Sequence, residues 1–95
     1  MLLKDYLPNI SKKFRNLNFS GLAFNSKKVK KNYIFVAIKG DRFDGNNYVN
    51  DAIKNGAKII ISSKFKDQIK NNIIYLKQKN PRQILSHLSS QIFKK

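Results

Sequence analysis

The hexapeptide YIFVAI, at residues 33–38, is a continuous apolar run and the clearest strand in the chain. Such a run is typical of a strand that is buried on both faces of a sheet. Downstream, residues 46–55 place apolar side chains at helical spacing, and Gly56 follows where helices often end in a glycine. A second apolar strand is predicted at residues 57–61. Strand, helix and strand in this order form a βαβ unit, so the two strands should be parallel neighbours.

Further regular elements are predicted on both sides of this unit. Residues 72–76 form a third buried strand. Asn80 and Pro81 then open a final helix, because asparagine suits the N-cap position and proline suits the first helical position. Upstream, residues 17–24 contain a short strand around Gly21. The chain is therefore expected to be a small α/β domain with a largely parallel or mixed sheet flanked by helices.

Three segments carry weaker signals. Residues 2–7 are predicted to form a short helix that Pro8 ends. Asn32 precedes the first apolar strand and is expected in the left-handed backbone region, which asparagine tolerates well. Residues 62–71 are ambiguous, and one helical turn is the expectation there.

The composition describes one domain with a strongly basic surface. The chain has 95 residues, is 41% hydrophobic and carries a net charge of +15. Its lysines are spread along the sequence, which favours a solvated basic surface over a dedicated nucleic-acid face. A basic nucleic-acid-binding module is the alternative, although no RNA-recognition motif supports it. There is no cysteine, no signal-peptide pattern and no apolar run of membrane-spanning length. We therefore expect a cytoplasmic location and no membrane partner.

Several catalytic and metal-binding classes are excluded by missing motifs. The sequence has neither a phosphate-binding loop of the GxxxxGK[ST] type nor a GxGxxG dinucleotide fingerprint. It has no glutamate, and His87 is its only histidine, so a two-histidine metal site is impossible. Asp41 and Asp44 are interpreted as turn formers rather than as an acid/base pair. No catalytic residue and no metal ligand are predicted in this chain.

Two polar loops follow predicted strands and should meet at one edge of the sheet. The first reads NSKK at residues 25–28, and the second reads KGDRFDG at residues 39–45. Ligands gather at the carboxyl ends of parallel strands. The loops offer a hydroxyl group, amides, cations, an aromatic ring and glycine-flanked backbone, a set that suits a planar base joined to a phosphate.

Residues 25–58 read NSKKVKKNYIFVAIKGDRFDGNNYVNDAIKNGAK, and this stretch resembles the N-terminal domain of the Mur ligases. These are ATP-dependent enzymes that build the peptide stem of bacterial peptidoglycan. The family pattern is roughly DSRxVxxGxLFVAxxGxxxDGxxFxxxAxxxGA, and the match has no gap. The closing helix, with Pro81, Arg82 and Phe93, looks more like the MurE type than the MurF type. The MurE type adds the third residue to UDP-N-acetylmuramoyl-L-alanyl-D-glutamate.

The resemblance implies that this domain holds the uridine diphosphate end of that substrate. Phe24 and Ser26 would lie against the uracil and its diphosphate, with Asn25 between them. Gly40, Asp41, Arg42 and Phe43 would form the second wall, where Arg42 could bond a phosphate and Phe43 could stack. The complete list of implied substrate-binding residues is Phe24, Asn25, Ser26, Gly40, Asp41, Arg42 and Phe43.

The chain departs from the family pattern at three positions. Asn25 replaces the usual aspartate, and Lys27 replaces the usual arginine and so loses forked hydrogen bonding. Asn32 replaces a glycine, which is a mild change. The resemblance implies that residues 1–95 are a single UDP-binding domain without the central ATPase and C-terminal domains. ATP and Mg²⁺ are expected for the full-length enzyme, and the missing central domain is an expected partner.

Overall fold

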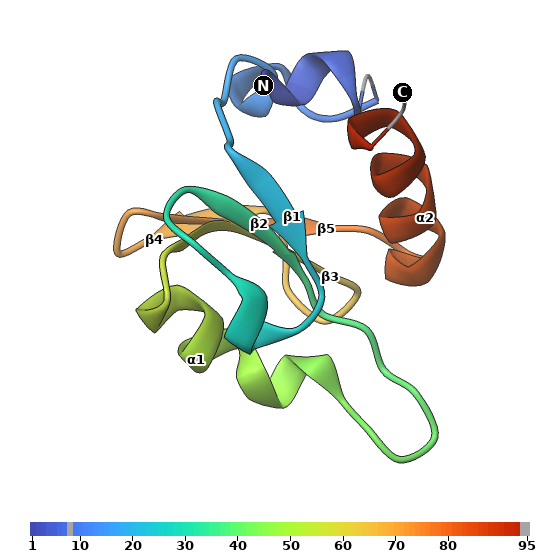
Figure 1. Ribbon diagram of the computed structural model, residues 1–95. Coiled ribbons are helices and arrows are strands. Elements are labelled where there is room, and N and C mark those ends of the chain that lie inside the picture. Colours follow the sequence, from blue (N-terminus) through green and yellow to red (C-terminus); the bar gives the residue numbers. More distant parts are fainter. Residues whose placement is uncertain (8, 94–95) are drawn as a thin grey trace.

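A five-stranded sheet with the order β1-β2-β3-β5-β4 forms the middle layer of the protein. The computed structural model describes residues 1–7 and 9–93 (Figure 1). The strands are β1 (Gly21–Ala23), β2 (Tyr33–Val36), β3 (Ala57–Ser62), β4 (Gln68–Lys70) and β5 (Ile73–Lys77). The helices are α1 (Val49–Lys54) and α2 (Pro81–Ile92). Short 3-10 helices cover Leu3–Asp5, Lys12–Phe14, Ser26–Lys28 and Gly45–Tyr48.

The pairing of the strands confirms the predicted α/β class. β1, β2, β3 and β5 run parallel to one another, whereas β4 pairs with β5 in antiparallel fashion. In the βαβ unit, Phe35 lies beside Ile60, and Val36 lies beside Ile61. The sheet is therefore mixed, with one short antiparallel strand at its edge.

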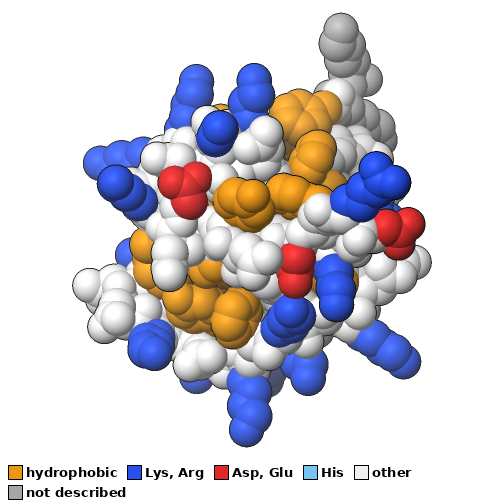
Figure 2. All heavy atoms as spheres, turned by 90° about the horizontal axis from the view of Figure 1, so that it is seen from below, with side chains coloured by type: hydrophobic (Ala, Val, Ile, Leu, Met, Phe, Trp, Pro, Cys, Tyr) orange, Lys and Arg blue, Asp and Glu red, His pale blue; other side chains and the backbone are white. Residues whose placement is uncertain are grey.

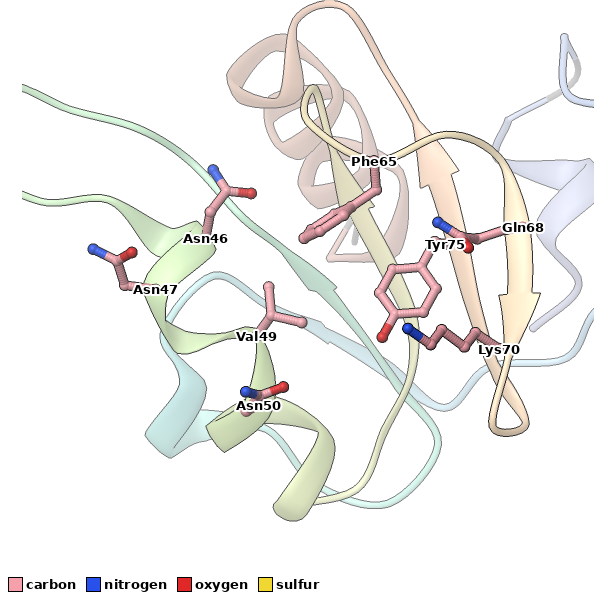
Figure 3. Close-up of a pocket in the computed structure, with 8 residues that line it drawn as sticks. All are labelled: Asn46, Asn47, Val49, Asn50, Phe65, Gln68, Lys70 and Tyr75. Carbon is pink, nitrogen blue, oxygen red and sulfur yellow. The ribbon is translucent and has the colours of Figure 1, made fainter.

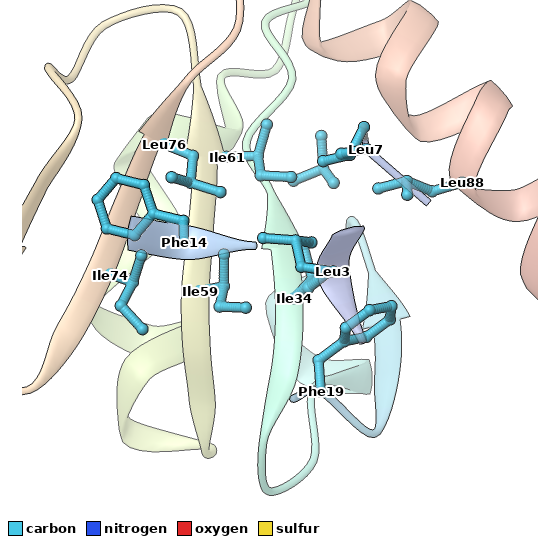
Figure 4. Close-up of a cluster of buried hydrophobic side chains, with 11 residues drawn as sticks. Leu3, Leu7, Phe14, Phe19, Ile34, Ile59, Ile61, Ile74, Leu76 and Leu88 are labelled. Atoms are coloured by element: carbon cyan, nitrogen blue, oxygen red, sulfur yellow. The ribbon is translucent and has the colours of Figure 1, made fainter. Parts of the chain in front are cut away.

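Successive side chains of the central strands point to opposite faces, and each face has its own core. On one face, Ile34 and Val36 pack with the N-terminal segment and α2. Figure 4 shows this cluster. Its fully or almost fully buried members are Leu3, Leu7, Phe14, Phe19, Ile34, Val36, Ile59, Ile61, Ile74, Leu76 and Leu88. On the other face, Phe35 and Ile60 pack against α1 through Val49 and Ala52.

The predicted local signals at the chain's turns are confirmed. Asn32 has a φ of 67°, and Gly56 has a φ of 118°. A Cβ on Gly56 would lie 2.7 Å from the Cα of Lys31, so both conformation and space require glycine there. The Asn80 side chain accepts a hydrogen bond from the backbone N–H of Gln83 at 3.2 Å and so caps α2.

The expectation of a helical turn within residues 62–71 is wrong, because β4 lies there. Asn71 and Asn72 both have positive φ values, of 51° and 65°, which is the backbone of a tight hairpin turn between antiparallel strands. The carboxylate of Asp67 accepts a hydrogen bond from the backbone N–H of Lys77 at 2.7 Å, next to the start of β4. This hairpin places β4 at the edge of the sheet.

Two predicted helices are shorter than expected. The segment predicted as a helix over residues 46–55 begins as a 3-10 turn, and its α-helix starts at Val49. The predicted N-terminal helix over residues 2–7 is a 3-10 turn, and Pro8 lies outside the described residues. Leu3 still anchors this segment, because it is completely buried and its N–H bonds the carbonyl of Leu17 at 2.8 Å.

Candidate functional site

A groove of about 670 Å³ opens where β1 and β2 end and α2 begins. Because α2 lies against β1 and β2, its first turns come beside the loops that follow those strands. The groove is lined by residues of three segments, namely Phe24, Asn25, Ser26, Lys27, Ile38, Gly40, Phe43, Tyr48, Arg82 and Leu85. Figure 2 views the molecule from below Figure 1 and shows hydrophobic side chains exposed between lysines and arginines.

The first wall of the groove is a short 3-10 turn that its own asparagine caps. The side chain of Asn25 accepts a hydrogen bond from the backbone N–H of Lys27 at 3.0 Å. Ser26 is only 4% exposed, although it lines the groove. Its carbonyl accepts a hydrogen bond from the Asn55 side chain at 2.9 Å, which ties the turn to the end of α1. The backbone at Ser26 is therefore held by two hydrogen bonds, one within the turn and one from Asn55.

The second wall is a narrow hairpin that extends from β2. The N–H of Gly40 bonds the carbonyl of Phe43 at 2.7 Å, and the N–H of Gly45 bonds the carbonyl of Ile38 at 2.8 Å. A Cβ on Gly45 would lie 2.7 Å from the backbone nitrogen of Ile38, so the hairpin closes only with glycine at this position. Phe43 stacks on Tyr48, with ring centroids 5.2 Å apart. The hairpin therefore carries an aromatic surface into the groove.

Asp44 holds the base of this hairpin through several hydrogen bonds. Its carboxylate accepts bonds from the side chain of Asn46 at 2.8 Å and from the backbone N–H of Asn46 at 2.9 Å. It also pairs with Lys64 at 3.0 Å. These interactions, first among them the side-chain bond from Asn46, lower the pKa of Asp44 from 3.8 to about 2. Asp44 is thus a structural anion, as its interpretation as a turn former predicted.

The charged groups around the groove favour an anionic ligand. Lys27 lies on the first wall, and Arg82 lies in the first turn of α2. A Cβ built on Gly40 would lie 3.9 Å from an Nη atom of Arg82, so the guanidinium group approaches the hairpin. No carboxylate is among the residues that line the groove. A phosphate placed here would meet two cations and no acidic side chain.

The structure brings together five of the seven residues implied as substrate-binding. These five are Phe24, Asn25, Ser26, Gly40 and Phe43. Asp41 and Arg42 lie at the exposed tip of the hairpin and are not among the lining residues. Their assigned contacts with the nucleotide stay a prediction, which this placement of the tip does not support.

Sequence reasoning missed several lining residues, above all Arg82 and Tyr48. A signal for Arg82 was available, because the helix that follows β5 starts at the same edge of the sheet as the two loops. A signal for Tyr48 was its place five residues after Phe43, just beyond the hairpin. Both were assigned only to helices.

The titratable groups outside the groove form no metal-binding cluster among the described residues. Within residues 1–7 and 9–93, no group of three His, Cys, Asp or Glu side chains could hold a metal ion. His87 is exposed, and its Nε2 lies 2.9 Å from the carbonyl oxygen of Tyr6, a contact that ties α2 to the N-terminal segment.

Sequence comparison identifies the family. The sequence model of the Mur ligase family, catalytic domain, matches residues 18–92. The chain belongs to the Mur ligase family. A relative from Clostridium acetobutylicum, UDP-N-acetylmuramoyl-L-alanyl-D-glutamate–2,6-diaminopimelate ligase 2, is 43% identical over 98 residues. The alignment covers 98% of this chain and 20% of the relative.

Other Mur ligases agree with this assignment. The UDP-N-acetylmuramoyl-L-alanyl-D-glutamate–2,6-diaminopimelate ligase of Fusobacterium nucleatum is 39% identical over 92 residues, covering 97% of this chain and 17% of the relative. These names confirm the predicted MurE-type resemblance. The chain spans about a fifth of the length of these two curated relatives.

Solved structures of Mur ligases share the fold. A UDP-N-acetylmuramoylalanyl-D-glutamyl-2,6-diaminopimelate–D-alanyl-D-alanyl ligase from Acinetobacter baumannii superposes with a TM-score of 0.69 at 23% identity. The superposition covers 93% of this chain and 20% of that one. MurF from Thermotoga maritima, solved with ADP, gives a TM-score of 0.60 at 31% identity, covering 74% of this chain and 16% of that one.

Among the described residues of this Mur ligase chain, no helix has both the length and the apolar character that a membrane span requires.

Proposed function

We propose that the groove binds the uridine diphosphate end of UDP-N-acetylmuramoyl-L-alanyl-D-glutamate, as part of an ATP-dependent ligase of peptidoglycan synthesis. One observation carries this proposal: an aromatic wall, a nearly buried serine and two cations converge on a groove without a lining carboxylate. The groove lies at the carboxyl ends of parallel strands, where ligands gather in such folds. The names of the two curated relatives make this nucleotide the first candidate.

The proposed roles follow from where each side chain lies. Phe24, Phe43 and Tyr48 provide ring surface for the uracil, since a planar base gains most from aromatic neighbours. Ser26 offers a hydroxyl group to the base edge or to a phosphate. Lys27 and Arg82 face the diphosphate, and the forked guanidinium of Arg82 can bond two phosphate oxygens. Arg82 takes the role that the family resemblance gave to Arg42.

The groove is proposed to hold the substrate without taking part in bond formation. Residues 1–95 would be the UDP-binding domain, which contributes binding energy remote from the reacting carboxylate. ATP and Mg²⁺ would be bound by other parts of the full-length ligase, because this sequence has no phosphate-binding loop and no suitable carboxylate group. Those parts would activate the substrate carboxylate. The proposed location of the ligase is the cytoplasm. The chain alone should show neither ATPase nor ligase activity.

The test is an NMR titration of the labelled chain with UDP and with UDP-N-acetylmuramoyl-L-alanyl-D-glutamate. We expect saturable shifts in residues 24–27, 38–43 and 82–85, and similar shifts with both ligands, because the shared uridine diphosphate makes the contacts. Saturation without any change in these three segments would refute the proposal. ATP hydrolysis or ligation by the pure chain would refute its non-catalytic part.

The basic surface favours a second candidate, a polyanion partner such as nucleic acid. The net charge is +15, and Lys64–Asp44 is the one ion pair found among the described residues. However, exposed lysines lie on loops at both ends of the sheet, and in Figure 2 they surround the exposed hydrophobic side chains. A short DNA duplex at physiological salt serves as the parallel sample. This second function would be favoured if DNA caused salt-sensitive chemical-shift changes across the lysines while UDP caused none.

A further inference from the structure

Helix α1 lies against both sides of the groove. It contacts the 3-10 turn Ser26–Lys28 of the first wall and the 3-10 turn Gly45–Tyr48, whose last residue lines the groove (Figure 1). Because α1 begins at Val49, directly after Tyr48, the chain itself joins the helix to the second side. The first wall precedes α1 by a strand and a hairpin, so its attachment to the helix depends on side chains.

Among the hydrogen bonds of the described residues, one joins the first wall to the end of α1. The side chain of Asn55, the residue that follows α1, donates from Nδ2 to the carbonyl oxygen of Ser26 at 2.9 Å. Just after the turn, Val29 is buried in the apolar cluster that also contains Val49 and Ala52 of α1. Apolar packing therefore holds the end of the turn, whereas the bond from Asn55 holds its first residue.

The bond from Asn55 acts on a peptide plane that belongs to the lining of the groove. The carbonyl group of Ser26 and the N–H group of Lys27 are parts of one planar peptide unit. The same N–H group donates to the side chain of Asn25 at 3.0 Å. Asn25, Ser26 and Lys27 all line the groove. By holding the carbonyl group, Asn55 therefore also orients the N–H group that Asn25 caps.

The second bond to the Ser26 carbonyl group is weaker than the bond from Asn55. Within the turn, this carbonyl accepts from the backbone N–H of Val29 at 3.3 Å, which is longer than the usual range of about 2.7–3.2 Å. The bond from Asn55, at 2.9 Å, has the most common length for such bonds. Without Asn55, the peptide plane between Ser26 and Lys27 would keep only the longer bond on its carbonyl side.

Asn55 is itself held in place by the end of the helix. Its backbone N–H bonds the carbonyl of Asp51 at 3.0 Å, and the next residue, Gly56, has a positive φ. The carbonyl of Gly56 accepts a hydrogen bond from the backbone N–H of Asn32 at 2.8 Å. The donor group therefore projects from a fixed backbone, and its short side chain loses less conformational entropy in making the bond than a long one would.

We propose that Asn55 is a positioning residue for the groove. It sets the affinity for the groove's ligand by holding the peptide plane between Ser26 and Lys27, although its own side chain is not among the lining residues. This role rests on the proposed function of the groove. A wall that is already ordered binds more tightly, because the ligand does not have to order it.

The experiment compares the binding of UDP by the wild type and by Asn55→Ala, using isothermal titration calorimetry at a temperature where both proteins are fully folded. The variant should bind UDP about three- to tenfold more weakly, the usual effect of losing one hydrogen bond. A residue with a purely structural role would lower the unfolding temperature and leave the affinity of the folded protein unchanged. Unchanged affinity under these conditions would overturn the proposal.

NMR relaxation of the free protein gives a second readout, one that needs no ligand. In Asn55→Ala, the backbone order parameters of residues 26–28 should fall, whereas those of β2 and β3 should keep their wild-type values. Unchanged order in the turn would overturn the proposal, because the peptide plane would then be held without Asn55.

Asn50→Ala is the matched control, because it removes the same type of side chain from an exposed position of α1. Figure 3 shows Asn50 at a separate hollow of about 310 Å³, between α1 and the strands β4 and β5. This hollow shares no lining residue with the groove. The control should bind UDP like the wild type, and an equal loss of affinity in both variants would overturn the role of Asn55.

The failure of this proposal and the failure of the groove's function give different results. A wild-type chain that does not bind UDP refutes the function of the groove, and the role of Asn55 falls with it. UDP binding that Asn55→Ala leaves unchanged refutes the role of Asn55 alone.

Discussion

The rings of Phe43 and Tyr48 stack at a centroid distance of 5.2 Å, with their planes inclined by only 14°. Both residues are more than 40% exposed, at 48% and 42%. An exposed pair of this kind adds little to a core, yet it presents one continuous aromatic surface to the groove. The stack therefore suits a ligand better than it suits the stability of the chain alone.

Substitution of Phe43 by alanine should weaken the binding of UDP by about 1–3 kcal/mol, because one ring of the aromatic wall is lost. The thermal midpoint should change little, since the side chain is half exposed. Isothermal titration calorimetry measures the first quantity and circular dichroism the second. Ile69→Ala, which removes an exposed apolar side chain from β4, is the control and should bind UDP normally. Unchanged affinity in Phe43→Ala would show that the ring does not contact the base.

Arg82→Gln should weaken the binding of UDP by about 1.5–3 kcal/mol, the usual contribution of a hydrogen bond to a charged group. Uridine, which has no phosphate, should bind both proteins equally. Lys79→Gln removes the same charge just before α2 but outside the groove, so it controls for the overall field. An equal loss in both variants would mean that Arg82 acts only through net charge.

The stability of the chain should depend on Asp44 in acid. Its pKa is about 2 in the folded protein and about 3.8 when unperturbed, so the charged form is favoured by folding. This contribution is complete above about pH 4 and is lost as the pH falls through 2. Urea unfolding of wild type and Asp44→Asn should show a difference in unfolding free energy that shrinks over this range. A constant difference would show that the Asn46 and Lys64 contacts do not favour the carboxylate.

Gly45→Ala should destabilise the chain by about 1–3 kcal/mol, because the added Cβ meets backbone atoms at the base of the hairpin. The matched control is Gly40→Ala in the same hairpin, where the nearest atom would be 3.7 Å away. Only the first variant should lower the midpoint of chemical unfolding. Equal stability of both variants would mean that the hairpin shifts without cost.

The sequence predicted those elements whose signals are local. The run at residues 33–38 contains β2, and Asn80 caps the last helix as expected. β4 was missed because it has three residues, one exposed apolar side chain and no buried run. Its best signal was the pair Asn71 and Asn72, since two adjacent asparagines can both adopt positive φ.

The candidate site was only partly predictable for a related reason. The two loops after β1 and β2 could be placed from the rule for parallel strands. The same rule places the start of α2 at that edge, but the contact of Arg82 with the groove also depends on how α2 crosses from β5 back to β1 and β2. Asp41 and Arg42 were assigned from the family pattern, and they lie at the exposed tip of the hairpin rather than among the lining residues.

The groove's walls come from residues 24–27, 38–48 and 82–85, so no short peptide of this chain contains the site. Ligand affinity and folding are consequently linked: whatever unfolds α2 also abolishes the site, and whatever fills the site opposes unfolding. A ligand at a hundred times its dissociation constant would add about 2.7 kcal/mol to the unfolding free energy. For a basic chain of 95 residues with a modest core, the occupied protein would then survive conditions that melt the empty one.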